Sequence, residues 1–178
     1  MDRNKKGDIW VSVVLYVLIS LVILSSVYMI VEPKINEAQD RAVVEQTIIL
    51  INDIDDAIKT ASQATGTVVM RQIKISKGDL FIYNATFGTN GTIVYMLNNT
   101  NLKYSQQGTP LTSGNIHVMT TTNKQSEDKY DVILTLNLQN KKVLNENNQN
   151  PWQLSASPLP YKLFIKSEAN NIFKFYTA

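Results

Sequence analysis

The chain has few of the side chains that perform catalysis. Its 178 residues include no cysteine and a single histidine, His117. The lack of cysteine excludes disulfides, thiol nucleophiles, iron–sulfur clusters and cysteine-based zinc sites, and one histidine cannot form a histidine-pair metal site. No phosphate-binding loop, metalloprotease helix, calcium loop or dinucleotide fingerprint is present. The sequence therefore predicts a protein that is not an enzyme and uses no cofactor or metal, in which His117 is structural or solvated.

Three asparagines could carry a different chemistry, N-glycosylation. Asn84, Asn90 and Asn98 each begin an Asn-x-Thr sequon, the acceptor motif for N-linked glycans. Three sequons are close to the number expected by chance in a chain with 18 asparagines. All three nevertheless fall within residues 84–100, in a predicted surface hairpin where a glycan has room. We expect at least one of them to be modified.

The charge balance excludes one class of partner. The chain has 17 basic and 15 acidic residues, a formal net charge of +2, and only 18% charged residues, whereas soluble domains average about 25%. So small a net charge cannot hold a phosphate backbone, so we expect no nucleic-acid partner.

The first forty residues contain a long apolar segment. Residues 9–31 form 23 positions without a charged side chain, and as a helix they would span about 34 Å, enough for a hydrocarbon layer of about 30 Å. The basic flank of Arg3, Lys5 and Lys6 predicts that the N-terminus stays in the cytoplasm. We therefore expect a single-pass membrane protein with an extracellular C-terminal domain. The side chains expected to pack along this segment are Ile9, Val13, Tyr16, Ser20, Leu24, Val27 and Val31.

Three interpretations of this segment compete. A cleaved secretory signal has an apolar region of only about 7–15 residues followed by a small-residue cleavage site, and this segment is longer and lacks that site. A plain signal anchor fits the length and the flanks. The third interpretation depends on the junction Lys5-Lys6-Gly7-Asp8, which touches the apolar segment directly.

This junction resembles the leader of archaeal type IV pilin-like proteins, the class III signal peptide family. The similarity extends over roughly the first 80 residues, through Gly7-Asp8-Ile9-Trp10-Val11-Ser12, Pro33 and Gly66…Arg71…Gly78. It implies that a prepilin peptidase cuts after Gly7 on the cytoplasmic side and leaves the apolar helix attached. Asp8 would then begin the mature chain and could cap the new helix N-terminus. Ser12 stands at the fifth mature position, where bacterial-type pilins carry a docking glutamate.

The apolar segment leads into an amphipathic pattern. We predict one helix from Ile9 to Thr65, kinked at Pro33 because proline removes a backbone donor, with Gly66 as its C-terminal cap. A break into two helices at residues 32–34 is the alternative. One apolar stripe is expected to face the head along the whole amphipathic part: Ile35, Ala38, Ala42, Leu50, Ile54, Ile58 and Ala61.

Beyond residue 67 the pattern predicts strands. Short apolar runs, several with period-two alternation, are separated by turn signals and indicate an antiparallel sheet with one wet face. Residues 145–160 contain three prolines and are predicted to form an irregular surface loop, in which Trp152 covers the core of the domain. The predicted strand runs are 68–75, 80–83, 93–97, 116–122, 130–138, 161–165 and 172–176.

These observations predict an α+β fold, a long N-terminal helix followed by an antiparallel β-sheet head. We divide the chain into a basic leader peptide (1–7), a transmembrane or filament-core helix (8–32), an amphipathic helix (33–66) and an extracellular β-rich head (67–178).

The resemblance implies a structural subunit of an extracellular type IV pilus-like filament, serving adhesion or surface attachment. Its partners would be the prepilin peptidase, other pilin-like subunits and, before assembly, membrane lipid. The alternative is a monomeric single-pass surface protein whose β-rich head binds a ligand or supports the envelope. A membrane-anchored enzyme would require a convergent acid–base site in the folded head.

Overall fold

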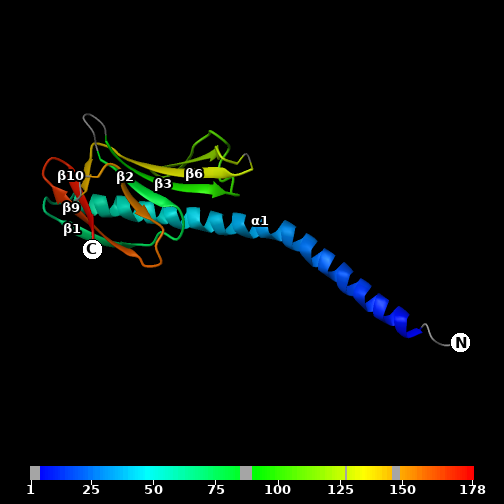
Figure 1. Cartoon of the computed structure of the whole chain (residues 1–178). Coiled ribbons are helices and arrows are strands. Elements are labelled where there is room, and N and C mark those ends of the chain that lie inside the picture. Colours follow the sequence, from blue (N-terminus) through cyan, green and yellow to red (C-terminus); the bar gives the residue numbers. More distant parts are fainter. Residues whose placement is uncertain (1–4, 85–89, 127, 146–148) are drawn as a thin grey trace.

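The computed structural model describes residues 5–84, 90–126, 128–145 and 149–178, with side chains from Trp10 onward. It has one long apolar N-terminal helix followed by a β-rich head, as Figure 1 shows. The predicted α+β fold class is therefore confirmed. Residues 1–4 of the predicted leader, including Arg3, lie outside the described residues.

Helix α1 (Lys5–Ala61) is continuous over 57 residues, and Pro33 is its central residue. Figure 1 shows that the helix axis bends about midway along its length, which is the effect of a proline that cannot donate to the carbonyl one turn earlier. The predicted start at Ile9 and end at Thr65 were each four residues too late. Gly7 and Asp8 consequently lie inside the first turns of α1 rather than ahead of it.

The helix ends at Ala61 because the backbone tightens there. Ser62 N still donates to Ile58 O at 2.9 Å, but Gln63 N donates to Thr60 O, and the Ser62 hydroxyl donates to Lys59 O at 2.6 Å. The sequence suggested that Gly66 caps α1, but it does not. Its φ of +88° turns the chain onto the sheet, where its N–H donates to Ser167 O.

The head contains two sheets instead of the single one predicted. The four-stranded sheet has the order β1 (Val68–Ile73), β9 (Tyr161–Glu168), β10 (Ile172–Thr177) and β7 (Lys142–Asn145). The six-stranded sheet has the order β4 (Leu111–Ser113), β5 (Ile116–Thr122), β6 (Tyr130–Leu138), β3 (Gly91–Thr100), β2 (Asp79–Tyr83) and β8 (Trp152–Ser155). All these pairs are antiparallel except β10 with β7, which is parallel.

All seven predicted runs form strands, and the three short strands β4, β7 and β8 were missed. The predicted irregular loop 145–160 is wrong in its middle, because Trp152 and Leu154 alternate inward along β8 and are buried. Trp152 is only 8% exposed, so it covers the core of the head as predicted.

The C-terminal half of α1 packs against both sheets, touching β1 and β9 of one and β3 and β5 of the other. Val44, Ile51, Ile54 and Ile58 are fully buried there with the inward side chains of β6 (Val132, Leu134, Leu136 and Leu138). The head and this half of the helix therefore share one hydrophobic core.

Candidate functional site

The N-terminal half of α1 extends away from the head, as Figure 1 shows. Every residue from Trp10 to Val31 is exposed, including the predicted packing side chains at positions 13, 16, 20, 24, 27 and 31. The side chain of Ile9 lies outside the described part. By length and composition this segment can cross a membrane, although a signal sequence meets the same criterion. The positions lie on one face of the helix by their three- and four-residue spacing, but all faces are equally uncovered.

Two serine hydroxyls in this half are satisfied by the helix itself. Ser20 Oγ donates to Tyr16 O and Ser26 Oγ donates to Val22 O, each at 2.8 Å. Such bonds to the preceding turn remove a donor that hydrocarbon could not satisfy. The serines therefore add small, internally bonded positions to an otherwise apolar surface.

A second uncovered stripe continues along the half of α1 that carries the head. Ile35, Ala38, Ala42 and Ile49 are exposed, with Ile49 at 70%. The sequence placed the first three on the core-facing stripe, which is wrong. From Ala42 to Ile54 the helix turns by about 120° beyond whole turns, so these residues lie on the side away from the buried row. We call these four residues the outward stripe.

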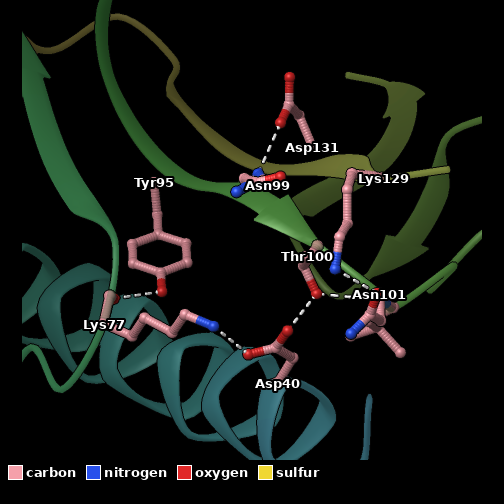
Figure 2. A network of polar contacts seen from close by, with 9 residues as sticks. Asp40, Lys77, Tyr95, Asn99, Thr100, Asn101, Lys129 and Asp131 are labelled. Atoms are coloured by element: carbon pink, nitrogen blue, oxygen red, sulfur yellow. Dashed lines mark hydrogen bonds and ion pairs between the residues drawn. The ribbon is translucent and has the colours of Figure 1, made fainter. Parts of the chain in front are cut away.

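Asp40 joins the helix to the head through a buried polar network (Figure 2). Its side chain is almost fully buried, and one carboxylate oxygen lies 2.5 Å from Lys77 Nζ while the other accepts from the hydroxyl of Thr100. The Thr100 hydroxyl in turn accepts from Leu102 N at 2.9 Å. Asp40 is thus held by charge and by hydrogen bonds, which is the condition under which a buried carboxylate is tolerated.

A bulge in β3 aims Thr100 at Asp40. Residues 98 and 99 oppose the single residue Asp131 on β6, and Asn99 has a φ of +56°. Its N–H donates to the Asp131 carboxylate at 3.0 Å, as drawn in Figure 2. Such a bulge adds one residue to the alternation and re-aims the side chains beyond it, so Thr100 turns into the core.

Lys77 is positioned from the other side by Tyr95 and Gly78. The hydroxyl of Tyr95 donates to Lys77 O at 2.5 Å. Gly78 has a φ of +77°, and a Cβ there would stand 2.5 Å from Met96 O, so only glycine allows this turn to lie against β3. Burial raises the pKa of the Tyr95 hydroxyl to about 12, against the opposing effect of a hydrogen bond with Thr47.

Two further carboxylates of α1 contact the head. Asp53 lies 2.9 Å from Arg71 Nε on β1, in an exposed ion pair. The nearly buried carboxylate of Asp55 accepts from Asn115 Nδ2 at 3.2 Å and lies 2.8 Å from Lys59 Nζ. Together with Asp40 these groups fix the register of the helix against the sheets.

The predicted processing residues and sequons occupy different ends of the molecule. Lys5, Lys6, Gly7 and Asp8 lie in the first turns of α1. The sequon asparagines Asn90 and Asn98 are exposed and Asn84 is half-buried; Ala85 and Thr86 of the first sequon lie outside the described residues. Thr100 of the third sequon is buried on Asp40, so Asn98 would have to be modified before the head folds.

His117 is exposed on β5, where its Nδ1 lies 3.4 Å from the Thr112 hydroxyl. Within the described ranges no group of three or more metal-ligating side chains comes together. Sequence reasoning missed the Asp40 network entirely. Asp40 lies one turn before the buried residue Val44, and an acidic residue in register with an apolar row was the signal that could have revealed it.

The chain matches no protein-family model, and no curated protein and no solved structure is significantly similar to it. The pilin-like resemblance therefore depends on the residues of the N-terminal region alone.

Proposed function

We propose that this chain is a pilin-like structural subunit, held in the membrane by residues 9–31 and able to assemble into an extracellular filament that serves adhesion or surface attachment. The supporting observation is that one unbroken helix is uncovered and apolar over 22 residues at one end and packed into a folded head at the other.

An uncovered apolar surface of this length requires a cover. A fully exposed Val, Leu or Ile side chain forgoes roughly 1.5–3 kcal/mol relative to a buried one, and the head supplies no contact to this half of α1. Lipid can cover it while the chain is a monomer. Other copies can replace the lipid in a filament, where association depends on packing, since both environments are apolar.

The outward stripe extends this surface beyond the membrane. In a filament, the residues of this stripe on one copy would contact uncovered side chains of a neighbouring copy. They are Ile35, Ala38, Ala42 and Ile49. The two alanines are four residues apart, a spacing that allows two helices to approach closely. Assembly would therefore use both halves of α1, the apolar span and the outer face of the amphipathic half.

Processing would prepare the subunit for this packing. A cut after Gly7 removes Asp2, Arg3, Lys5 and Lys6, after which acidic and basic side chains are equal in number. A neutral subunit is repelled little by its copies. The cut also removes the charges that would otherwise hold one end of the helix at the membrane face.

Intact mass and surface shearing test the proposal in a host that carries a prepilin peptidase. We expect the native protein to lack residues 1–7 and to occur in the sheared surface fraction. Gly7→Val should retain the leader and remove the protein from that fraction. Ser26→Val is the matched control, because it places the same side chain in the same helix away from the junction, and it should be processed normally.

Other results would contradict the proposal in distinct ways. A retained leader together with monomeric protein in the membrane would favour the single-pass surface protein. A dissolved chain that begins near residue 30 or later would exclude both membrane interpretations.

A further inference from the structure

A polar cleft lies at the end of the head that surrounds the last turns of α1. Its volume is about 270 Å³, and its walls come from three segments that are distant in sequence. Asp55 and Lys59 come from α1, Asn115 from the turn between β4 and β5, and Asn137 with Gln139 from the end of β6. The volume is slightly below the range of about 300–1,000 Å³ that drug-sized ligand sites occupy, so the cleft admits at most one small ligand or one terminal unit of a longer chain.

The frame of the cleft is fixed by bonds that leave much of its polar lining available. Asp55 is nearly buried and holds Asn115 at 3.2 Å. On the opposite wall Lys141 N donates to Leu138 O, and Lys141 O accepts from Gly91 N at 2.9 Å. The side chains of Asn137 and Gln139 are exposed at the end of β6. A fixed frame of this kind lowers the entropy that a ligand must overcome on binding.

The charges around the cleft nearly cancel. Lys59 Nζ lies 2.8 Å from Asp55 and 3.0 Å from Asp56, and these contacts raise the pKa of Lys59, the hydrogen bond with Asp55 having the largest effect. Lys141, which also lines the cleft, offsets the charge of Asp56, which lies beside Lys59 but outside the lining. An anion would meet the carboxylate of Asp55, and a metal cation would meet two ammonium groups, so neither is favoured.

The lining offers donors and acceptors in the same small space. Each amide of Asn115, Asn137 and Gln139 can both donate and accept, whereas a lysine only donates and a carboxylate only accepts. Hydroxyl groups have the same dual character. A ligand with several neighbouring hydroxyls can therefore use every group in the lining, while an anion uses only the donors.

We infer that this cleft binds a neutral sugar residue, whose hydroxyls donate to the Asp55 carboxylate, accept from Lys141, and exchange hydrogen bonds with the three amides. The imidazole of His117 is the one ring among the described lining residues, and no phenylalanine, tyrosine or tryptophan lies there to stack on a sugar face, so binding to a single sugar is weak, in the millimolar range. The site belongs to one head and does not depend on the proposed filament. If the filament forms, its repeated heads would bind a polysaccharide more tightly through multivalency.

Saturation-transfer NMR on the full chain tests this inference. The chain is held in lipid nanodiscs, because sugar-headed detergents would compete for the cleft. The probes are the methyl glycosides of glucose, galactose, mannose and N-acetylglucosamine, short oligosaccharides that end in them, and inorganic phosphate. We expect transfer to at least one neutral glycoside. The double variant Asn137→Ala/Gln139→Ala should weaken that binding about tenfold, whereas Gln106→Ala, which removes an exposed amide outside the cleft, should leave it unchanged.

The outcomes distinguish a single sugar residue from the end of a sugar chain, and a neutral sugar from an anion. Equal binding of a monosaccharide and an oligosaccharide identifies a single-residue site, and stronger oligosaccharide binding identifies a chain end; both support the inference. No transfer to any neutral sugar, equal binding by the folded double variant, or binding of phosphate alone would overturn it. Circular dichroism establishes that the variants are folded. Because the readout uses monomers, failure here leaves the filament proposal intact, and failed processing at Gly7 leaves the cleft intact.

Discussion

The two halves of α1 share one backbone and have opposite surroundings. From Trp10 to Val31 every residue is exposed and almost every one is apolar. From Asp40 to Ala61 the buried row is covered by both sheets, and Asp40 and the exposed Asp53 form ion pairs with the head. The comparison teaches that helix formation alone does not distinguish the halves. The head covers and stabilises one of them and leaves the other uncovered.

The largest expected effect separates the halves by core packing. Ile54→Ala should lower the free energy of unfolding of the head by about 2–5 kcal/mol, because it leaves a cavity in the core. Ile23→Ala, at an exposed position of the other half, should change it by less than about 0.5 kcal/mol. Thermal or denaturant unfolding can be followed by fluorescence of the buried Trp152 in a Trp10→Phe background. Equal losses in the two variants would contradict the division.

An arginine placed on the apolar span or on the outward stripe tests whether the two exposed surfaces serve different purposes, membrane insertion and contact between copies. Ile19→Arg should reduce membrane insertion by roughly 2.5–3.5 kcal/mol, the cost of an arginine at the centre of a spanning helix. Ile49→Arg, on the outward stripe beyond the span, should insert normally and reduce only the sheared filament fraction. The carbonate-resistant membrane fraction measures insertion. Loss of insertion in both variants would mean that the span extends past Pro33.

The attachment of the helix to the head can be weakened at Asp40. Asp40→Ala leaves the buried Thr100 hydroxyl without its acceptor and Lys77 without its partner, so we expect a loss of about 2–3 kcal/mol in unfolding free energy. Asp53→Ala removes only the exposed pair with Arg71 and should cost less than about 1 kcal/mol. If the two losses were alike in chemical denaturation, the buried network would not anchor the helix.

The smallest effect is a dependence on alkaline pH. The pKa of Tyr95 rises from its ordinary value of 10 to about 12 in the folded chain. The folded state therefore keeps a proton that the unfolded state has lost. The resulting stability is fully present below pH 10 and is lost as the pH rises toward 12, with an upper limit of about 2.7 kcal/mol. Tyr95→Phe should flatten this part of the profile of unfolding free energy against pH. Comparing the variant with the unmodified chain cancels the titration of the lysines that both contain.

Much of the fold could be predicted because its signals are long and periodic. Val132, Leu134, Leu136 and Leu138 alternate over the full predicted strand 130–138, and all four are buried. The short strands escaped because three or four residues carry too little alternation, and because the prolines around Trp152 indicate a loop. The parallel pairing of β10 with β7 brings together strands that are far apart in sequence, and no local pattern encodes it.

The candidate site was less predictable than the fold. Helical periodicity identified apolar stripes on α1 but not which stripe faces the head, so Ile35, Ala38 and Ala42 were placed on the wrong side. Asp40 has charged and polar neighbours in the sequence, Gln39 and Arg41, and neither marks it as buried. Its burial depends on Lys77 and Thr100, which lie 37 and 60 residues away along the chain. The cleft at Asp55 likewise exists only after three distant segments have met.

The continuity of α1 through Pro33 has a mechanical consequence. Traction on the head passes directly into the span along a single rod, with no flexible tether to absorb it. The rod is weakest at its midpoint, where the carbonyl of Met29 lacks the helical donor that Pro33 cannot provide. We expect force spectroscopy to register a short extension at this joint before the head unfolds.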